Sequence, residues 1–102
     1  MKEITIKTFE KEIAAPMAVV QFSGKGCPNC RVQEKFLTDI AAARTDIAFL
    51  KIDTSDAREL TTKYDITTLP TLLFFRDGVV VGELVSLKPR VLIEKKVAEV
   101  FG

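Results

Sequence analysis

Two cysteines, Cys27 and Cys30, offer the clearest chemistry in this 102-residue chain. They form a single C-x-x-C, and the chain has no third cysteine with which either could pair. A secreted scaffold held by disulfides distributes several cysteines along its length, so this usage favours redox chemistry or metal binding. Because the chain has no histidine, two thiolates supply only half of a four-ligand zinc site, and zinc would need a second chain or carboxylates. A purely structural disulfide is the other alternative.

The surroundings of the pair predict a reactive thiolate at Cys27. The first cysteine is expected at a helix N-terminus, where unpaired backbone N–H groups and the helix dipole favour negative charge. Lys25 and Arg31 add positive charge on either side, and Pro28 suits the first helical turn because its missing N–H has no intrahelical acceptor there. We therefore predict that Cys27 attacks a substrate disulfide and that Cys30, one turn deeper, resolves the mixed disulfide.

The elements that must position this pair alternate between strand and helix patterns. Strands are predicted over Lys2 to Lys7, Met17 to Phe22, Ile47 to Asp53, Thr71 to Phe75 and Val79 to Val85. Helices are predicted over Phe9 to Ala15, from near Cys27, from Asp56 to about Lys63, and from near Pro89 through Ile93, Val97, Val100 and Phe101.

The long helix after Cys27 is predicted to cover a buried sheet. Val32, Phe36 and Ile40 recur every fourth residue, with Leu37 and Ala41 beside them, and this stripe is expected to face the core. The strands on either side should be parallel and joined by a right-handed crossover. The cysteine loop then falls at the carboxyl end of a strand, where α/β folds place their sites.

Local signals predict the helix starts and one turn. Thr8 is expected to cap the first helix, and Asp56 with Glu59 three residues later reads as a capping box. Asp77-Gly78 between two apolar runs predicts a hairpin with a type I′ turn, because this dipeptide accommodates two positive φ angles. The hairpin strands are antiparallel, so the sheet is expected to be mixed.

Length and charge set the broad class. The chain, at 47% hydrophobic residues, is expected to form a single domain over residues 1–102. Fifteen basic and fourteen acidic side chains give a net charge of +1, so no global field favours nucleic acid or a membrane. No apolar run approaches the roughly 20 residues of a membrane span, and the first nine residues lack the apolar core of a signal peptide. We therefore expect a cytoplasmic protein that is a monomer.

Beyond the cysteines, several motifs make the chain resemble the thioredoxin family over nearly all of its length. They are Cys27-Pro-Asn-Cys30, Lys63-Tyr64-Asp65-Ile66, Leu69-Pro70-Thr71 and the Phe75-Arg-Asp-Gly78 hairpin. The resemblance implies a three-layer α/β/α fold with a mixed central sheet and a redox-active Cys27–Cys30 disulfide with no other cofactor. It also implies protein disulfides as substrates in the cytosol, and a thioredoxin-reductase-like or other dithiol electron donor.

The same resemblance implies that Pro70 is cis and lies against the cysteine pair. The backbone near Leu69 would then be free to bind an extended substrate, as in strand addition. We also predict substrate contacts for Pro28 and Asn29, which lie between the two cysteines.

The chain departs from the family at the positions that tune the site. Gln21, six residues before Cys27, stands where the family has a buried aspartate that assists the second cysteine, and glutamine cannot accept a proton. Lys51 matches the lysine that partners that aspartate, so we expect it to be a strand-edge charge and Cys30 to resolve slowly. Ser23 and Gly26 replace tryptophans, which predicts a more open rim. Ser86 replaces a glycine of the substrate groove, and together these changes predict a specialised set of partners.

Other functions are compatible with the same cysteines. Glutaredoxins share Cys-Pro-x-Cys and the cis-proline, and Lys25, Arg31 and Lys63 could bind glutathione carboxylates, although the glycine-pair and aspartate signature for glutathione is missing. A thioredoxin-fold module that binds a metal or an iron–sulfur cluster is a second alternative. A partner-binding domain with an inert disulfide is a third.

Overall fold

A single five-stranded mixed sheet organises the chain, which the computed structural model describes from residue 1 to residue 102. The strand order is β1-β3-β2-β4-β5, with β1, β3 and β2 parallel and with β4 and β5 antiparallel to their neighbours. The strands are β1 Lys2–Ile4, β2 Met17–Ser23, β3 Ala48–Asp53, β4 Thr71–Arg76 and β5 Val79–Val85. The helices are α1 Phe9–Ile13, α2 Pro28–Ala43, the 3₁₀ turn η1 Thr54–Asp56, α3 Arg58–Lys63 and α4 Arg90–Phe101.

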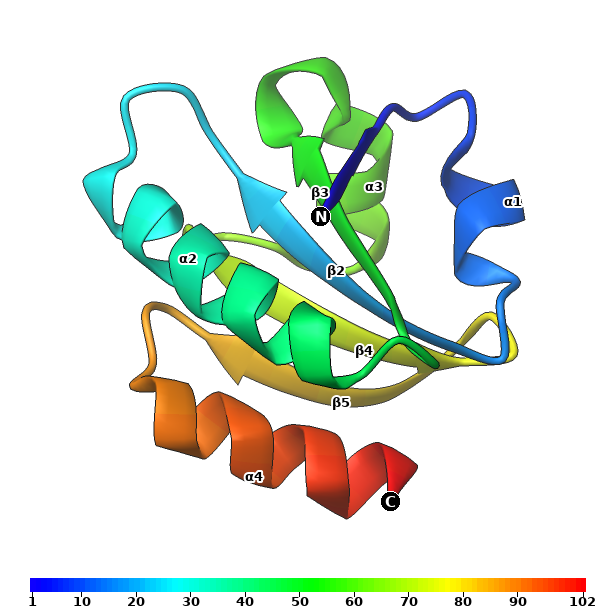
Figure 1. Ribbon diagram of the computed structural model, residues 1–102. Helices are drawn as coiled ribbons and strands as arrows, with labels where there is room; N and C mark the ends of the chain where they lie inside the picture. Colours follow the sequence, from blue (N-terminus) through cyan, green and yellow to red (C-terminus); the bar gives the residue numbers. More distant parts are fainter.

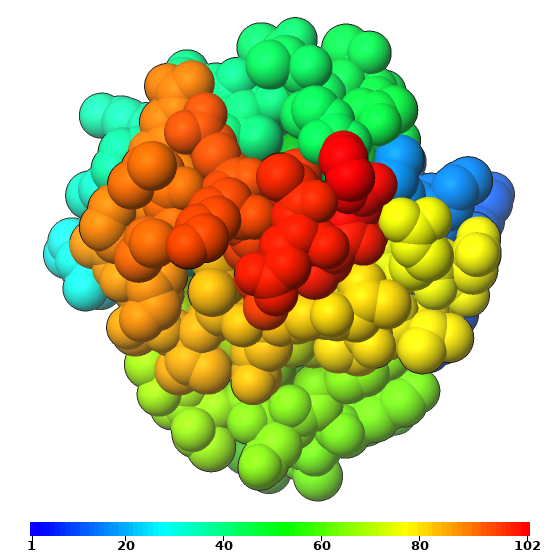
Figure 2. Space-filling view, turned by 90° about the horizontal axis from the view of Figure 1, so that it is seen from below, coloured from blue at the N-terminus to red at the C-terminus, as the bar shows by residue number.

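Helices cover both faces of this sheet (Figure 1). On one side α1 and α3 pack on the sheet, and on the other side α2 and α4 do so. The predicted three-layer α/β/α fold with a mixed sheet is therefore confirmed. Figure 2 views the α4 side, where the helix lies across the sheet next to β5.

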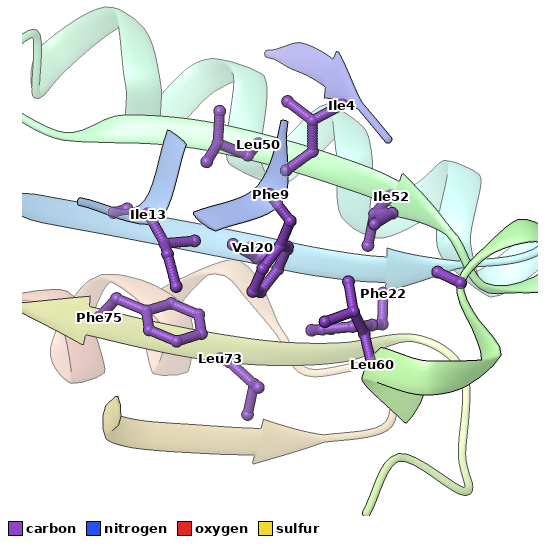
Figure 3. Packing of buried hydrophobic residues seen from close by; sticks show 12 residues of the cluster. Ile4, Phe9, Ile13, Val20, Phe22, Leu50, Ile52, Leu60, Leu73 and Phe75 are labelled. Atoms are coloured by element: carbon purple, nitrogen blue, oxygen red, sulfur yellow. The ribbon is translucent and has the colours of Figure 1, made fainter. Parts of the chain in front are cut away.

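Alternation along β2 divides its side chains between two cores. Val20 and Phe22 point into the cluster under α1 and α3, where Phe9 and Phe75 meet edge to face with ring centroids 6.0 Å apart (Figure 3). Val19 packs into the second cluster under α2 and α4. The next two residues on that second face are polar, and the strand thereby presents polar groups to α2.

The buried face of α2 differs from the predicted stripe. It consists of Cys30, Gln33, Leu37 and Ile40, whereas Val32 is 41% exposed. A step of four residues overshoots a helical turn of about 3.6 residues, so a row drawn from Ile40 back to Val32 rotates off the buried face. The prediction for Val32 is therefore wrong, and a glutamine occupies the core position instead.

The predicted helix caps were also incorrect. Thr8 precedes α1 but makes no side-chain capping bond, and its hydroxyl donates to the Thr5 carbonyl at 3.4 Å. The capping box of Asp56 does not form, because the Asp53 carboxylate accepts from the Ser55 N–H at 2.9 Å and Asp56 becomes part of η1.

The hairpin prediction is confirmed. β4 and β5 pair in antiparallel fashion around Asp77 and Gly78, which have φ angles of 51° and 80°. Two consecutive positive φ angles are those of a type I′ turn, and glycine adopts the second without a Cβ clash. No helix of the chain combines the length and the apolar character that a membrane crossing requires.

Candidate active site

Three loops meet at one end of the sheet. Strand register places Phe22 opposite Thr71 and Thr71 opposite Val85, so the carboxyl end of β2, the amino end of β4 and the carboxyl end of β5 are adjacent. The first loop carries the cysteines, the second the proline before β4, and the third begins at Ser86.

The two cysteines form a disulfide across the first turn of α2. Their Cα atoms are 5.3 Å apart. Cys27 is the N-cap residue of α2 and is half-buried, whereas Cys30 is completely buried. The Cys30 N–H donates to the Cys27 Sγ at 3.2 Å, so a backbone donor already points at the sulfur that would carry a thiolate. An approaching disulfide can therefore reach only Cys27.

Pro28 and Asn29 form the exposed corner between the sulfurs. Pro28 is the first helical residue, as predicted, and both side chains are open to solvent. Their position beside Cys27 is compatible with the predicted substrate contact.

The second loop brings Leu69 and Pro70 to the cysteine loop. The Leu69–Pro70 peptide bond is cis, as the family resemblance implied. A Cβ added to Gly24 would lie 2.8 Å from the Leu69 Cδ1, so the Leu69 side chain packs directly over Gly24 and the two loops are in contact. Thr71 closes the turn by donating its hydroxyl to the Thr68 carbonyl at 2.6 Å.

Gln21 lies on the inner side of Cys30. It is fully buried on β2, and its Nε2 donates to the Cys30 carbonyl at 3.0 Å and to the Ser23 Oγ at 2.7 Å. Its Oε1 has no hydrogen-bond partner in the protein. Ser23 is buried as well, where it accepts from Gln21, and it also lines the cleft beside the cysteine loop. Gly26, by contrast, is exposed.

Lys51 has a partner that sequence reasoning missed. Its Nζ lies 2.6 Å from an oxygen of Glu34, and Arg31 binds the other oxygen at 2.9 Å. Burial alone would raise the pKa of Glu34, but the hydrogen bonds from Lys51 and Arg31 outweigh it and lower that pKa. Lys51 lies on the internal strand β3, so the expectation of a strand-edge charge was wrong. The spacing of Arg31 and Glu34, three residues apart on one helix, was the available signal for the Arg31 half of this cluster.

The cations near Cys27 are balanced by carboxylates. Lys25, Arg31 and Lys51 line a cleft of about 390 Å³ together with Asp53 and Glu3. Hydrogen bonds from Ser55 lower the pKa of Asp53, and the charges of Lys25 and Arg31 lower it further. The Cys30 N–H, which donates to the Cys27 Sγ, is therefore the positive group in direct contact with the sulfur.

The cations considered for glutathione do not form one group. Lys63 lies apart from the cleft, on α3, where it pairs with Glu10 at 3.6 Å. No group of three or more His, Cys, Asp or Glu side chains is arranged to hold a metal ion.

The disulfide joins a half-buried cysteine to a fully buried one and lies beside a cis-proline. This arrangement is typical of thioredoxin-fold proteins that exchange thiols and disulfides. The family model described as Thioredoxin matches residues 1–99. A thioredoxin from Mycoplasmoides gallisepticum is 28% identical over 92 residues, which cover 88% of this chain and 92% of the relative. A thioredoxin from Listeria monocytogenes is 30% identical over 91 residues, which cover 88% of each chain.

Solved structures agree on the fold. Plasmodium falciparum thioredoxin superposes with a TM-score of 0.89 at 22% identity, over 97% of this chain and 98% of that one. Oxidised mitochondrial thioredoxin 3 from Saccharomyces cerevisiae gives a TM-score of 0.87 at 21% identity, over 97% and 94% of the two chains. The chain belongs to the thioredoxin family and is a thiol-disulfide oxidoreductase with its CxxC site at Cys27 and Cys30.

Proposed function

We propose that this protein reduces the disulfides of other proteins by dithiol-disulfide exchange. The Cys27 thiolate attacks one sulfur of the substrate disulfide, that bond breaks, and the other substrate sulfur leaves as a thiolate that takes up a proton. Cys30 then loses its proton and attacks the Cys27 sulfur, which releases the second substrate thiol. The Cys27–Cys30 disulfide forms and two electrons pass to the substrate.

The unequal access of the two sulfurs is the observation that supports these roles. Cys27 is half-buried, caps α2 and accepts a hydrogen bond from the Cys30 N–H, while Cys30 is fully buried. A backbone donor at a helix N-terminus favours the thiolate, and thiolate is the nucleophilic form. Cys27 is therefore the nucleophile, and Cys30 acts only from within.

The substrate chain would lie across the exposed loop ends beside Cys27. The backbone next to Leu69 and Pro70 would pair with an extended segment of the substrate, and Pro28 with Asn29 would contact its other side. The contact between Gly24 and the Leu69 side chain supports this placement, because it puts the two loops side by side.

The partners and place of action follow from the family. We propose that the protein works as a monomer in the cytoplasm, as one domain over residues 1–102. A thioredoxin-reductase-like enzyme or another dithiol donor would return the Cys27–Cys30 disulfide to the dithiol, since each turnover consumes two electrons.

A trapping experiment tests the proposal. The substrate is insulin with its native disulfides. The Cys30→Ser variant should accumulate a mixed disulfide between Cys27 and insulin, and the Cys27→Ser variant should accumulate none. The reduction potential of the wild-type pair, measured in glutathione buffers, should lie at or below the cytosolic range of roughly −220 to −320 mV. A clearly more oxidising potential would favour the glutaredoxin-like function instead. A Cys30→Ser variant that forms a mixed disulfide with glutathione but none with insulin would favour it as well. Stoichiometric metal lost on Cys27→Ser would favour the metal-binding one.

A further inference from the structure

Gln33 is a completely buried glutamine in the core face of α2, one turn after Cys30. Its Oε1 accepts a hydrogen bond from the Lys88 backbone N–H at 3.1 Å. Lys88 lies 55 residues away, in the segment that joins β5 to α4. Figures 1 and 2 both show the start of α4 beside the first half of α2. This bond therefore ties the cysteine-bearing helix to the third loop of the site.

The bond is unfavourable for stability alone. Because a backbone N–H can be accepted only by oxygen, the Lys88 bond fixes the orientation of the amide and leaves the Gln33 Nε2 buried without a partner. An unsatisfied buried donor costs more than a typical hydrogen bond contributes. A leucine of similar size would fill the same space without that donor, and the N–H of Lys88, a partly exposed residue, would bind water instead. A side chain of this kind at a core position indicates a role other than packing.

The loop that Gln33 holds has an unusual backbone. Ser86 has a φ of 66°, in the left-handed region that a residue with a Cβ rarely adopts. It follows Val85, which pairs with Thr71, so it lies at the same sheet end as Pro70. A loop that starts from a disfavoured conformation needs contacts elsewhere to hold it, and the Gln33 bond is one such contact.

We propose that Gln33 is a positioning residue that sets substrate specificity by fixing the Ser86–Lys88 loop as the third side of the groove around Cys27. A polypeptide that bears the disulfide is long enough to touch this loop, whereas a small disulfide reaches Cys27 without it. Gln33 thus favours protein disulfides over small ones. The inference rests on the proposed protein-disulfide reduction and names a determinant of its substrate class.

The Gln33→Leu variant tests this role. Single-turnover oxidation of the reduced protein is followed at increasing insulin concentration, and in parallel with the small substrate hydroxyethyl disulfide. We expect the half-saturating insulin concentration to rise about fivefold, as for the loss of one hydrogen bond. The rate with hydroxyethyl disulfide and the reduction potential should not change, and the melting temperature should stay equal or rise.

A matched control breaks a link between α2 and α4 that does not involve the Ser86–Lys88 loop. Asp39 on α2 pairs with Arg90 on α4 at 3.2 Å, but both side chains are exposed. Asp39→Asn should leave the insulin concentration dependence unchanged.

The outcomes separate the two proposals. An unchanged insulin dependence in Gln33→Leu, or an equal loss with both substrates, would overturn the role of Gln33. A wild-type protein that reacts with hydroxyethyl disulfide but not with insulin would contradict protein-disulfide reduction itself.

Discussion

Replacing Gln21 by aspartate would return a carboxyl group to the interior beside Cys30. Gln21 is fully buried, and its only partners are the Ser23 hydroxyl and the Cys30 carbonyl. The ammonium of Lys51 is engaged by Glu34, so desolvation should dominate and raise the pKa of the new carboxyl. A carboxylate whose pKa approaches neutrality is an effective general base. We expect Gln21→Asp to shorten the life of the mixed disulfide about a hundredfold, the low end for such a base.

The same substitution should cost stability. Gln21 donates two hydrogen bonds, at 2.7 and 3.0 Å, and a carboxylate cannot donate either of them; the Ser23 hydroxyl can turn to donate to it, but the Cys30 carbonyl cannot. Each contributes about 1 kcal/mol, and burial of the charge adds to the loss, so the free energy of unfolding should fall by about 2–4 kcal/mol at neutral pH. Because the folded pKa lies above the unfolded value of about 4, the loss is small at lower pH and grows as the pH rises toward the folded pKa.

The assay measures how long the mixed disulfide survives. Reduced protein is mixed with insulin, quenched with acid at intervals and weighed by mass spectrometry, from about pH 6 to about pH 9. Gln21→Asn is the matched control, because asparagine has the size of aspartate and no charge. The Asp variant should show a short lifetime with a step at the pKa of its carboxyl, and the Asn variant should show no such step. Equal lifetimes for the two variants at every pH would refute the argument that Cys30 lacks a base.

Two further substitutions test the surroundings of the site. Glu34→Gln should lower the free energy of unfolding by about 1 kcal/mol at pH 7, through loss of a partly buried ion pair, and should have little effect near pH 3. Because the folded pKa of Glu34 is depressed, its contribution to stability is present above the unfolded pKa and disappears as the pH falls through the folded pKa. Thermal melts at the two pH values measure both losses, and equal losses would contradict this reasoning. Ser86→Gly should raise the stability by about 1 kcal/mol, because glycine adopts a φ of 66° without the Cβ penalty, and a lower midpoint in urea would show that the serine side chain stabilises the loop.

The fold could be predicted because several local signals agree with one topology. The apolar run of β2, the Asp77-Gly78 turn and the helical periodicity of α4 each specify an element without knowledge of the others. The position of the site followed from the same signals, since Cys27 comes directly after a buried parallel strand. Where several signals agree, a segment is correctly predicted as helix or strand even though its ends differ from the prediction by one or two residues.

What could not be predicted depends on contacts between distant parts of the chain. The predicted capping box at Asp56 is absent because the Asp53 carboxylate, at the end of β3, accepts from the Ser55 N–H and caps η1, which contains Asp56. Gln33 was overlooked because a polar residue in a helix reads as exposed, and its acceptor role depends on a backbone 55 residues away. Glu34 was overlooked because its partner Lys51 is on β3, 17 residues away. For Gln33 and Glu34, no short window of sequence contains both members of the pair.

The polar groups around the cysteines separate into a neutral interior and a charged exterior. The buried ones, Gln21, Ser23 and Gln33, carry no charge. The charged ones lie outside, where Glu34 binds both Arg31 and Lys51. Arg31 is thereby paired, so the helix N-terminus and the exposed Lys25 are the positive groups that remain to stabilise a thiolate at Cys27. On the inner side of Cys30, Gln21 offers no group that accepts a proton, so we expect the second step of exchange to draw on solvent or on the departing substrate thiolate. Resolution is then coupled to the substrate itself, which makes the loops that hold that substrate part of the chemistry.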